Sequence, residues 1–235
     1  MTGTIFQGTR TGLYKWFVAI NLMANAKKSI SSSQLARDLY ITQPTAWLMQ
    51  QRIRKEMAKR SSPLLKGIIE ADETFIGGKP RRRKNDDGHL PPPTPRGRGT
   101  KKSKVLGAVE RDGHVVAKVV TDLSGSTIMK FVTSCIRGGS RIITDEYKGF
   151  SRVKQVMKHD VVQHAAYQYV DAEDPTIHTN TIEGFWSLLK RAWYGTHHHY
   201  SKKYAPLYVA EACWKYNHRH DDDAFETFLL GCVKS

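Results

Sequence analysis

The serine-serine-proline triplet at residues 61–63 divides the sequence into two parts whose apolar residues repeat with different periods. Before it, apolar side chains recur at helical spacing, so residues 13–60 are predicted to be helical. After it come stretches rich in β-branched residues, such as GIIEADETFIG and HVVAKVVTD, which favour strands. Since proline interrupts a helix, we predict a small all-α domain over residues 1–62 and a second domain over residues 63–235.

The order of elements in the second part indicates its fold class. Three predicted strands are followed by a helix (TIMKFVTSCIRG), a strand (RIITDEY), a short strand around HDVVQH and two closing helices. This order describes an α/β domain with a sheet flanked by helices, and it is compatible with a ribonuclease H-like mixed sheet. At 235 residues the chain is long enough to bury a substantial core.

Within the first part, SSSQLARDLYITQPTAW is predicted to form two short helices joined by a tight turn, which is a helix-turn-helix pattern. Ser33 and Thr42 are the expected N-caps of these helices. In a helix-turn-helix the start of the second helix enters the major groove, so Gln43, Thr45 and Gln50 would face base edges. An ordinary helical hairpin is the alternative.

Lysine and arginine outnumber aspartate and glutamate by 37 to 22, which gives a formal net charge of +15. Such a charge attracts a polyanion, so nucleic acid is the expected partner. Much of the excess lies between the first two predicted strands, in a proline- and glycine-rich stretch at residues 79–104 that we expect to be a flexible loop along a phosphate backbone. The candidate DNA-contacting residues of this loop are Arg81, Arg82, Arg83, Lys84, Arg96, Arg98, Lys101 and Lys102.

Several other classes of protein are disfavoured. Cys135, Cys213 and Cys232 are far apart and form no CxxC pair, which argues against a disulfide framework and a zinc ribbon. The three consecutive histidines at 197–199 point in different directions, so no zinc site is expected there. No apolar run approaches the roughly 18 residues of a membrane span. We therefore expect no membrane partner and a cytoplasmic protein, associated with the nucleoid when bound to DNA.

Two aspartates are candidate metal ligands. Asp72 lies inside an apolar strand, where an acidic residue is costly unless it binds something. Asp145 ends the strand RIITD, and functional groups in α/β sheets cluster at the carboxyl ends of strands; a turn residue or helix cap is the alternative. Glu73 and Glu146 rank second because strand alternation turns them to the opposite face. Carboxylates of this kind hold the divalent ions used to break phosphodiester bonds.

A third carboxylate, Glu183, has two interpretations. Local sequence favours a capping box in which Asn180 caps the helix and Glu183 reaches back to the cap amide. Alternatively, Lys190 lies within about 20° of Glu183 on the helical wheel, so one stripe would offer a carboxylate to metal and a cation to phosphate. Arg191 adds a further candidate DNA contact, and His178 is open between a hydrogen-bonding, DNA-contact or metal role.

The motifs EADETFIGGK, ITDEYKGF, HTNTIEGFWSLLKR and YVAEACWKYNHR, with SSSQLARDLYITQPTAWLMQQRIR upstream, closely resemble prokaryotic insertion-sequence transposases of the Asp-Asp-Glu/Asn class. The resemblance is to the group with an ISXO2-like catalytic domain and extends from Gly8 to Arg219. It implies a ribonuclease H-like domain, two Mg²⁺ ions with Mn²⁺ as an expected substitute, and action on terminal inverted repeats and target DNA. Because both element ends must be joined, it also implies a homodimer or higher assembly.

The same resemblance assigns roles to the carboxylates. Asp72 matches the first catalytic aspartate and Asp145 the second. Members carry glutamate or asparagine at the third position, and we assign Glu183, with Asn180 as the alternative. Asp72 is then expected to bridge two ions, Asp145 to bind one and Glu183 the other, while Lys190 contacts phosphate. Relatives commonly begin with a cysteine-paired zinc ribbon, which this sequence lacks.

Two alternative functions are compatible with the same features. A ribonuclease H-like nuclease or resolvase would cleave DNA without strand transfer, and a strand-transfer assay separates it from a transposase. A DNA-binding regulator would use only the helix-turn-helix and bind without metal. The regulator leaves the acidic residue inside the first strand unexplained.

Overall fold

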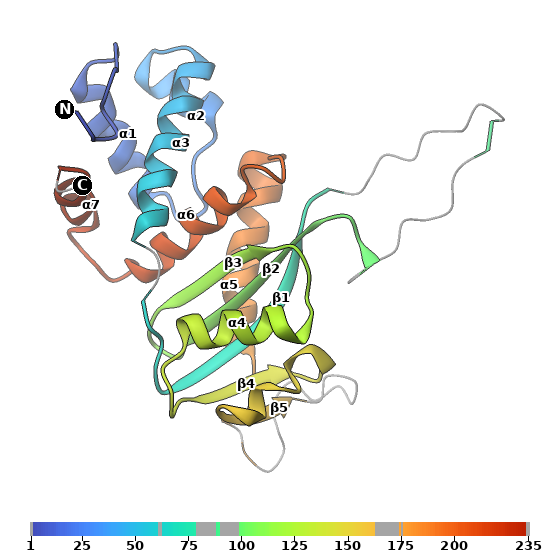
Figure 1. Ribbon diagram of the computed structural model, residues 1–235. Coiled ribbons are helices and arrows are strands. Elements are labelled where there is room, and N and C mark those ends of the chain that lie inside the picture. Colours follow the sequence, from blue (N-terminus) through green and yellow to red (C-terminus); the bar gives the residue numbers. More distant parts are fainter. Residues whose placement is uncertain are drawn as a thin grey trace.

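The computed structural model describes residues 2–60, 63–78, 88–89, 99–162, 174 and 176–233. In these parts of the chain a five-stranded sheet has helices on both faces, and a group of helices lies at one end of it (Figure 1). None of the described helices is both long enough and apolar enough to cross a membrane.

The sheet has the strand order β3-β2-β1-β4-β5. Its strands are β1 (Ile68–Ile76), β2 (Ser103–Glu110), β3 (Val115–Val120), β4 (Arg141–Asp145) and β5 (Lys158–Val162). The first three strands are antiparallel, whereas β4 runs parallel to β1 and β5 runs parallel to β4. The predicted α/β class, with a mixed sheet flanked by helices, is confirmed.

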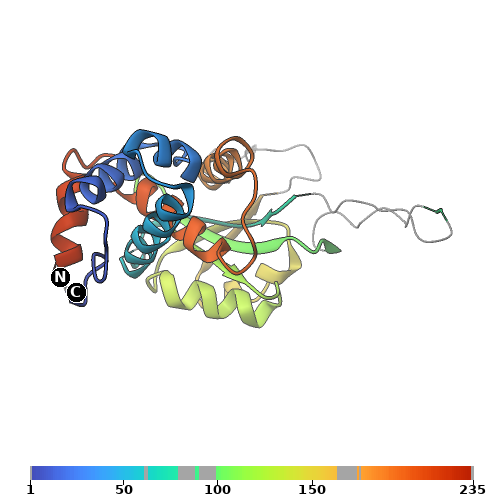
Figure 2. The same ribbon diagram turned by 90° about the horizontal axis from the view of Figure 1, so that it is seen from above.

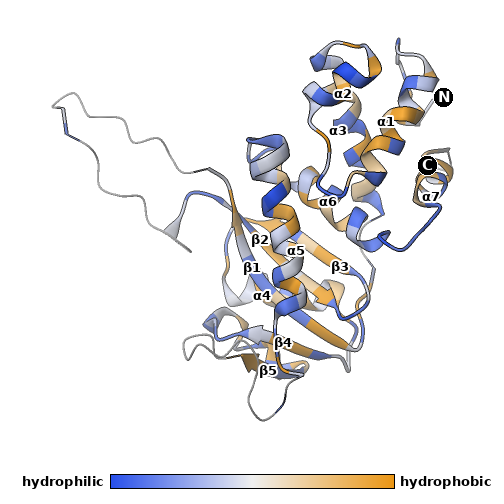
Figure 3. Ribbon diagram, turned by 180° about the vertical axis from the view of Figure 1, so that it is seen from behind, coloured by the Kyte–Doolittle hydropathy of each residue, from blue (hydrophilic) through white to orange (hydrophobic). Residues whose placement is uncertain are grey.

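Helices cover the two faces of this sheet differently. Helix α4 (Gly125–Cys135) lies on one face, and α5 (Asn180–Arg191) lies on the other together with α6 (Ala205–Asn217) (Figures 1 and 3). Ile69 and Ala71 of β1 belong to the apolar cluster under α4, whereas Ile76 belongs to the cluster under α5. Because strand residues alternate between faces, the even-numbered residues of β1 point toward α5. In Figure 3 the part of α5 that crosses the sheet carries both hydrophobic and hydrophilic colours, as an amphipathic helix does.

The remaining helices pack together beside the sheet. They are α1 (Leu13–Asn25), α2 (Ser32–Leu39), α3 (Gln43–Lys59) and α7 (Ala224–Val233). One buried cluster joins Met23 and Met57 of the first part to Trp214, Phe228 and Cys232 near the other end of the chain. The two ends of the chain accordingly lie close together at the helical end of the molecule (Figures 1 and 2). The division into domains at residue 62 stays a prediction, and the helical group contains residues from both sides of it.

The caps of the two short helices differ in part from those expected. Helix α2 begins earlier than predicted, and its N-cap is Ser31, whose hydroxyl accepts a hydrogen bond from the Gln34 amide, so the assignment to Ser33 is wrong. Thr42 is the N-cap residue of α3, but its side chain makes no cap hydrogen bond; its hydroxyl lies 2.8 Å from that of Thr45.

Three short helical turns complete the fold. The 3₁₀ turns η2 (Lys148–Phe150) and η3 (Val153–Gln155) follow β4, and the π-helical segment η5 (Ala192–His197) continues α5. Residues of η2 and η3 join the cluster under α4, so they extend the cover of that face. In η5, His197 packs edge-on against Tyr208 at 4.7 Å between ring centroids, and burial lowers its pKa to about 4.

Candidate metal centre

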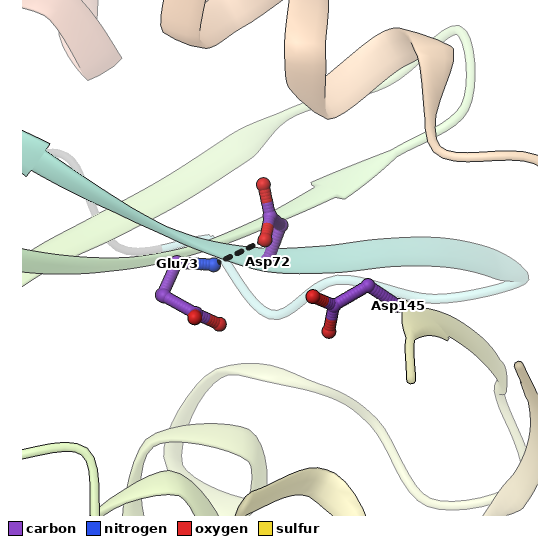
Figure 4. A group of neighbouring side chains, drawn as sticks. All are labelled: Asp72, Glu73 and Asp145. Carbon is purple, nitrogen blue, oxygen red and sulfur yellow. Dashed lines mark hydrogen bonds between the residues drawn. The ribbon is translucent and has the colours of Figure 1, made fainter. Parts of the chain in front are cut away.

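Strand β4 ends at Asp145, whereas its neighbour β1 continues to Ile76. In the parallel register Ala71 pairs with Thr144, so Asp72 and Asp145 are the next residues on the two strands. One carboxylate oxygen from each of Asp72, Glu73 and Asp145 lies within 4.8 Å of the other two (Figure 4). The end of β4 thus brings together three carboxylates beside the part of β1 that β4 leaves unpaired.

The presence of Glu73 in this group corrects the sequence analysis. Strand alternation sends Asp72 and Glu73 to opposite sides of β1, as expected, and Figure 4 shows this divergence. Beyond Ala71, however, no residue of β4 pairs with this edge of β1, so the longer side chain of Glu73 approaches Asp145 around the edge. The opposite direction of its side chain therefore does not separate its carboxylate from the two aspartates.

Burial raises the pKa of Asp72 to about 7, and the charges of Asp145 and Glu73 act in the same direction. Two hydrogen bonds oppose this shift: the Glu73 amide donates to Oδ1 at 2.7 Å and the Trp186 indole donates to Oδ2 at 3.0 Å. A divalent cation would neutralise the repulsion among these groups. Since carboxylate oxygens are the hard ligands that Mg²⁺ and Mn²⁺ prefer, this set of side chains fits such an ion.

Helix α5 faces Asp72 and Glu73 across a cavity of about 510 Å³. The cavity is lined by Asp72, Glu73, Thr74, Glu183, Trp186, Ser187, Lys190, Arg191 and Tyr194. Glu183 and Lys190 therefore share one stripe of the helix, as the helical wheel predicts, and that stripe faces β1. Among the described residues, Glu183 does not belong to the group of three carboxylates within 4.8 Å, so it forms the opposite wall of the cavity.

The start of α5 does not form the capping box suggested by its local sequence. Its N-cap residue is Thr179, whose hydroxyl donates to Oε1 of Glu183 at 3.2 Å, and Asn180 is an exposed first residue of the helix. The amides of Thr181 and Ile182 donate instead to a carboxylate from the neighbouring strand. A full negative charge from β1 thus takes the place that the sequence analysis gave to Asn180.

That carboxylate belongs to Glu70, which the sequence analysis did not select. Its side chain is 0% exposed, and its Oε1 accepts a hydrogen bond from Arg111 Nε at 2.8 Å. His178 Nδ1 lies 3.3 Å from the same oxygen, so His178 has a hydrogen-bonding environment next to Glu70 and Arg111. Like Asp72, Glu70 is an acidic residue inside an apolar strand and must bind something, so the same reasoning could have found it.

The candidate DNA-contacting residues of α3 differ in how far they are exposed. Gln43 is exposed and donates from Nε2 to Ser32 Oγ at 2.7 Å, and Thr45 is half-buried. Gln50 is only 1% exposed and donates to the Ile30 carbonyl at 2.9 Å, so its predicted contact with base edges is wrong. It lies on the face of α3 that packs against the segment before α2.

The basic residues after β1 are described only in part. Lys101 is exposed and Lys102 half-buried. Arg81, Arg82, Arg83, Lys84, Arg96 and Arg98 lie outside the described residues. Lys190 and Arg191 are exposed and line the cavity, so α5 supplies basic side chains beside Asp72 and Glu73.

Comparison with known proteins places this geometry in a family. The sequence model of the ISXO2-like transposase domain matches residues 64–217, which include β1 to β5, α5 and α6. A relative from Halobacterium salinarum, described as an uncharacterized protein in transposable element ISH50, is 26% identical over 211 residues, covering 86% of this chain and 68% of the relative.

Solved structures give a weaker likeness. A Mos1 strand transfer complex is 14% identical with a TM-score of 0.36, and the match covers 97% of this chain and 80% of that one. A Mos1 mariner paired end complex with Mn is 14% identical with a TM-score of 0.30, covering 97% of this chain and 80% of that one. These scores are too low to add to the assignment, which rests on the sequence match over the greater part of the chain. On that match, the chain belongs to the ISXO2-like transposase family.

Proposed function

We propose that the protein is the DNA transposase of an insertion sequence, which cleaves the phosphodiester bonds at the ends of its element and transfers the 3′-hydroxyl to target DNA. One observation carries the proposal: Asp72, Glu73 and Asp145 converge within 4.8 Å at the end of β4 in a transposase-family chain. The cavity beside them offers a further carboxylate, Glu183, and a cation, Lys190.

The proposal includes a ribonuclease H-like catalytic domain over residues 63–235 and a helix-turn-helix domain over residues 1–62. The order β3-β2-β1-β4-β5, with three antiparallel strands and then two parallel ones, supports the first assignment. For the second, α2 and α3 are joined by a short turn in which Tyr40 has a left-handed φ of 51°. Gln43 and Thr45 at the start of α3 remain the candidate base contacts.

Two divalent ions, Mg²⁺ or Mn²⁺, are the proposed cofactors. Asp72, Asp145 and Glu183 would hold them. When bound, such ions activate an attacking hydroxyl and stabilise the departing oxyanion. Glu73 lies close enough to Asp72 and Asp145 to take part in the same site.

The other residues at the cavity would hold the ligands and the DNA. The Trp186 indole and the Glu73 amide fix the two oxygens of Asp72 by hydrogen bonds of 3.0 and 2.7 Å. Lys190 and Arg191 line the cavity and carry charges suited to phosphate oxygens. The partners would be terminal inverted repeats and target DNA, with the basic residues at 79–104 along the backbone, and pairing of two ends would need a homodimer or higher assembly.

The test is cleavage of DNA that carries the ends of the element, with Asp72→Asn as the variant. We expect Asp72→Asn to abolish Mg²⁺-dependent cleavage while retaining DNA binding. Asp222→Asn, which changes an exposed aspartate outside the sheet, should retain both. Cleavage by Asp72→Asn at the wild-type rate would overturn the proposal. Cleavage by the wild type without joining to target DNA would favour a nuclease or resolvase, and binding without any cleavage would favour a regulator.

A further inference from the structure

Glu70 connects strand β1 to the start of helix α5. Its Oε2 accepts hydrogen bonds from the Thr181 amide at 2.7 Å and the Ile182 amide at 3.0 Å, and its Oε1 accepts one from the Thr181 hydroxyl at 2.9 Å. The side chain is fully buried. The first amides of a helix have no partner within the helix and carry a partial positive charge, so a carboxylate there is a strong, charge-assisted cap.

The opposite side of the carboxylate is also fixed. Arg111, at the turn between β2 and β3, donates from Nε to Glu70 Oε1 at 2.8 Å and from Nη2 to the His178 carbonyl at 3.0 Å. Arg111 thus holds both Glu70 and the residue that leads into α5. Since the charges of Glu70 and Arg111 compensate each other, this buried ion pair links the β2–β3 turn, β1 and the start of α5.

Helix α5 has a second attachment to the same strand. Trp186 donates to Oδ2 of Asp72 at 3.0 Å. Asp72 comes two residues after Glu70 and lies on the same face of β1. Two strand residues span about 7 Å, and the four residues from Ile182 to Trp186 rise about 6 Å. The matched spacing lets both attachments form at once, and Glu183 lies between them on the helix.

From this arrangement we infer that Glu70 is a positioning residue of the proposed metal centre. Its buried carboxylate fixes the start of α5 relative to β1, and so sets where Glu183 and Lys190 stand opposite Asp72. The inference rests on the proposed function, because it concerns the same site, but Glu70 is fully buried and would act through the position of α5. With the amides of Thr181 and Ile182 unanchored, the start of α5 loses its charged cap, while its apolar contacts and the Trp186 hydrogen bond remain.

The test is Glu70→Gln, which keeps the size of the side chain but removes its charge and places an NH₂ donor among donors. The probe is the Trp186 indole N–H signal in ¹H–¹⁵N NMR spectra, assigned with Trp186→Phe and followed while Mg²⁺ is added to the full chain. In the wild type the signal should shift as Mg²⁺ binds, because the indole donates to Asp72. In Glu70→Gln we expect the Mg²⁺ concentration at the midpoint of this shift to rise at least tenfold. The Mg²⁺ concentration needed for cleavage should rise in parallel.

A matched control separates positioning from general destabilisation. Glu56 is also a buried acid, 2% exposed, with the cationic partners Lys59 and Arg60, but it lies in α3 and does not line the cavity. Glu56→Gln should lower the unfolding temperature and leave the Mg²⁺ midpoint unchanged, with all proteins measured well below their unfolding temperatures.

A milder variant covers the case in which Glu70→Gln does not fold. Thr181→Val removes one hydrogen bond to Glu70 and keeps both amides, so the midpoint should rise two- to threefold. An unchanged midpoint in the folded Glu70→Gln protein, or in Thr181→Val if Glu70→Gln does not fold, overturns the inference. Asp72→Asn distinguishes failure of the proposed metal site from failure of the inference about Glu70. If Asp72→Asn still shows the wild-type Mg²⁺ shift, the metal site itself is wrong. If Asp72→Asn loses the shift while the Glu70 and Thr181 variants keep the wild-type midpoint, only the role of Glu70 is contradicted.

Discussion

Two buried acidic groups in this molecule have opposite electrostatic surroundings. Glu211 of α6, 2% exposed, contacts Arg54 at 2.6 Å and Lys215 at 2.6 Å. Burial alone would raise the pKa of Glu211, but the charges of Lys215 and Arg54 outweigh it and hold the pKa well below the ordinary range. At the sheet edge, burial and the neighbouring carboxylates Asp145 and Glu73 raise the pKa of Asp72 to about 7.

The difference separates a cluster whose charges compensate each other from the candidate metal centre, whose charges do not. Around Glu211, the charges compensate and join α3, α6 and, through Ser29, the segment between α1 and α2. Around Asp72, like charges face one another, which weakens the fold unless a cation is bound. Clusters of the second kind are a characteristic of functional sites. Substitutions in and around the two clusters test this contrast, and the largest effect is expected at Glu211.

Glu211→Gln should produce the largest loss of stability. It leaves Arg54 and Lys215 close together without their common counter-charge, and breaking a buried ion pair from one side costs about 3–5 kcal/mol. Urea unfolding at pH 7 measures the loss, with the exposed Glu226 of α7 changed to glutamine as the control. A loss below about 1 kcal/mol, the size expected for a surface pair, would contradict the structural role of this cluster.

Gly107→Ala should disturb the sheet edge through Trp186. Gly107 pairs with Asp72 in the register, and a Cβ there would lie 2.4 Å from Cη2 of the Trp186 indole. Because the ring is packed in the apolar cluster under α5, it must shift, at a cost of about 1–3 kcal/mol, and its hydrogen bond to Asp72 should weaken.

Gly184→Ala is the matched control for that substitution. Nothing lies within 4 Å of a Cβ at Gly184, which is exposed inside α5, so alanine should stabilise the helix by about 0.5–1 kcal/mol. Thermal unfolding of both variants and their Mg²⁺ midpoints provide the comparison. Equal unfolding temperatures for the two would show that the indole does not limit the space above Gly107.

The pKa of Asp72 predicts a pH dependence that Glu211 does not share. An acid whose folded pKa is raised keeps its proton in the folded state between about pH 4 and 7, while the unfolded state releases it, so stability falls as pH rises through this window. In EDTA we expect the wild type to lose on the order of 2 kcal/mol relative to Asp72→Asn between pH 4 and 8. Unfolding curves for the two proteins at both pH values measure it, and Mg²⁺ at pH 8 should restore the wild type; parallel losses would contradict the raised pKa.

Local sequence reasoning identified the elements of the sheet but not all of their partners. Asp72 and Asp145 could be found because one lies inside a strand and the other ends one, and both features are local. Glu70 is also an acid inside the same strand and could have been selected in the same way, but its role could not be predicted because its partners on α5 are 111 and 112 residues away. The same limit hid the return of α7 to the first helices, and periodicity did not show that Gln50 is buried. Alternation gives the direction of a side chain, but it did not reveal that Glu73 reaches around the end of β4.

The smallest expected effect belongs to Asn180→Ala, and it determines how far the sheet-edge cluster extends along α5. Asn180 is exposed, makes no cap hydrogen bond, and is not among the residues that line the cavity, whereas Glu183 lies on its wall. We therefore expect Asn180→Ala to change stability by no more than about 0.5 kcal/mol, as for an ordinary surface substitution, and to leave Mg²⁺-dependent cleavage near the wild-type rate. Glu183→Gln, which keeps the size of the side chain and removes the charge of the proposed third ligand, should reduce that rate strongly. If Asn180→Ala instead lost cleavage and Glu183→Gln retained it, the third ligand would be assigned to Asn180. That result would mean that α5 turns toward β1 when DNA and metal bind.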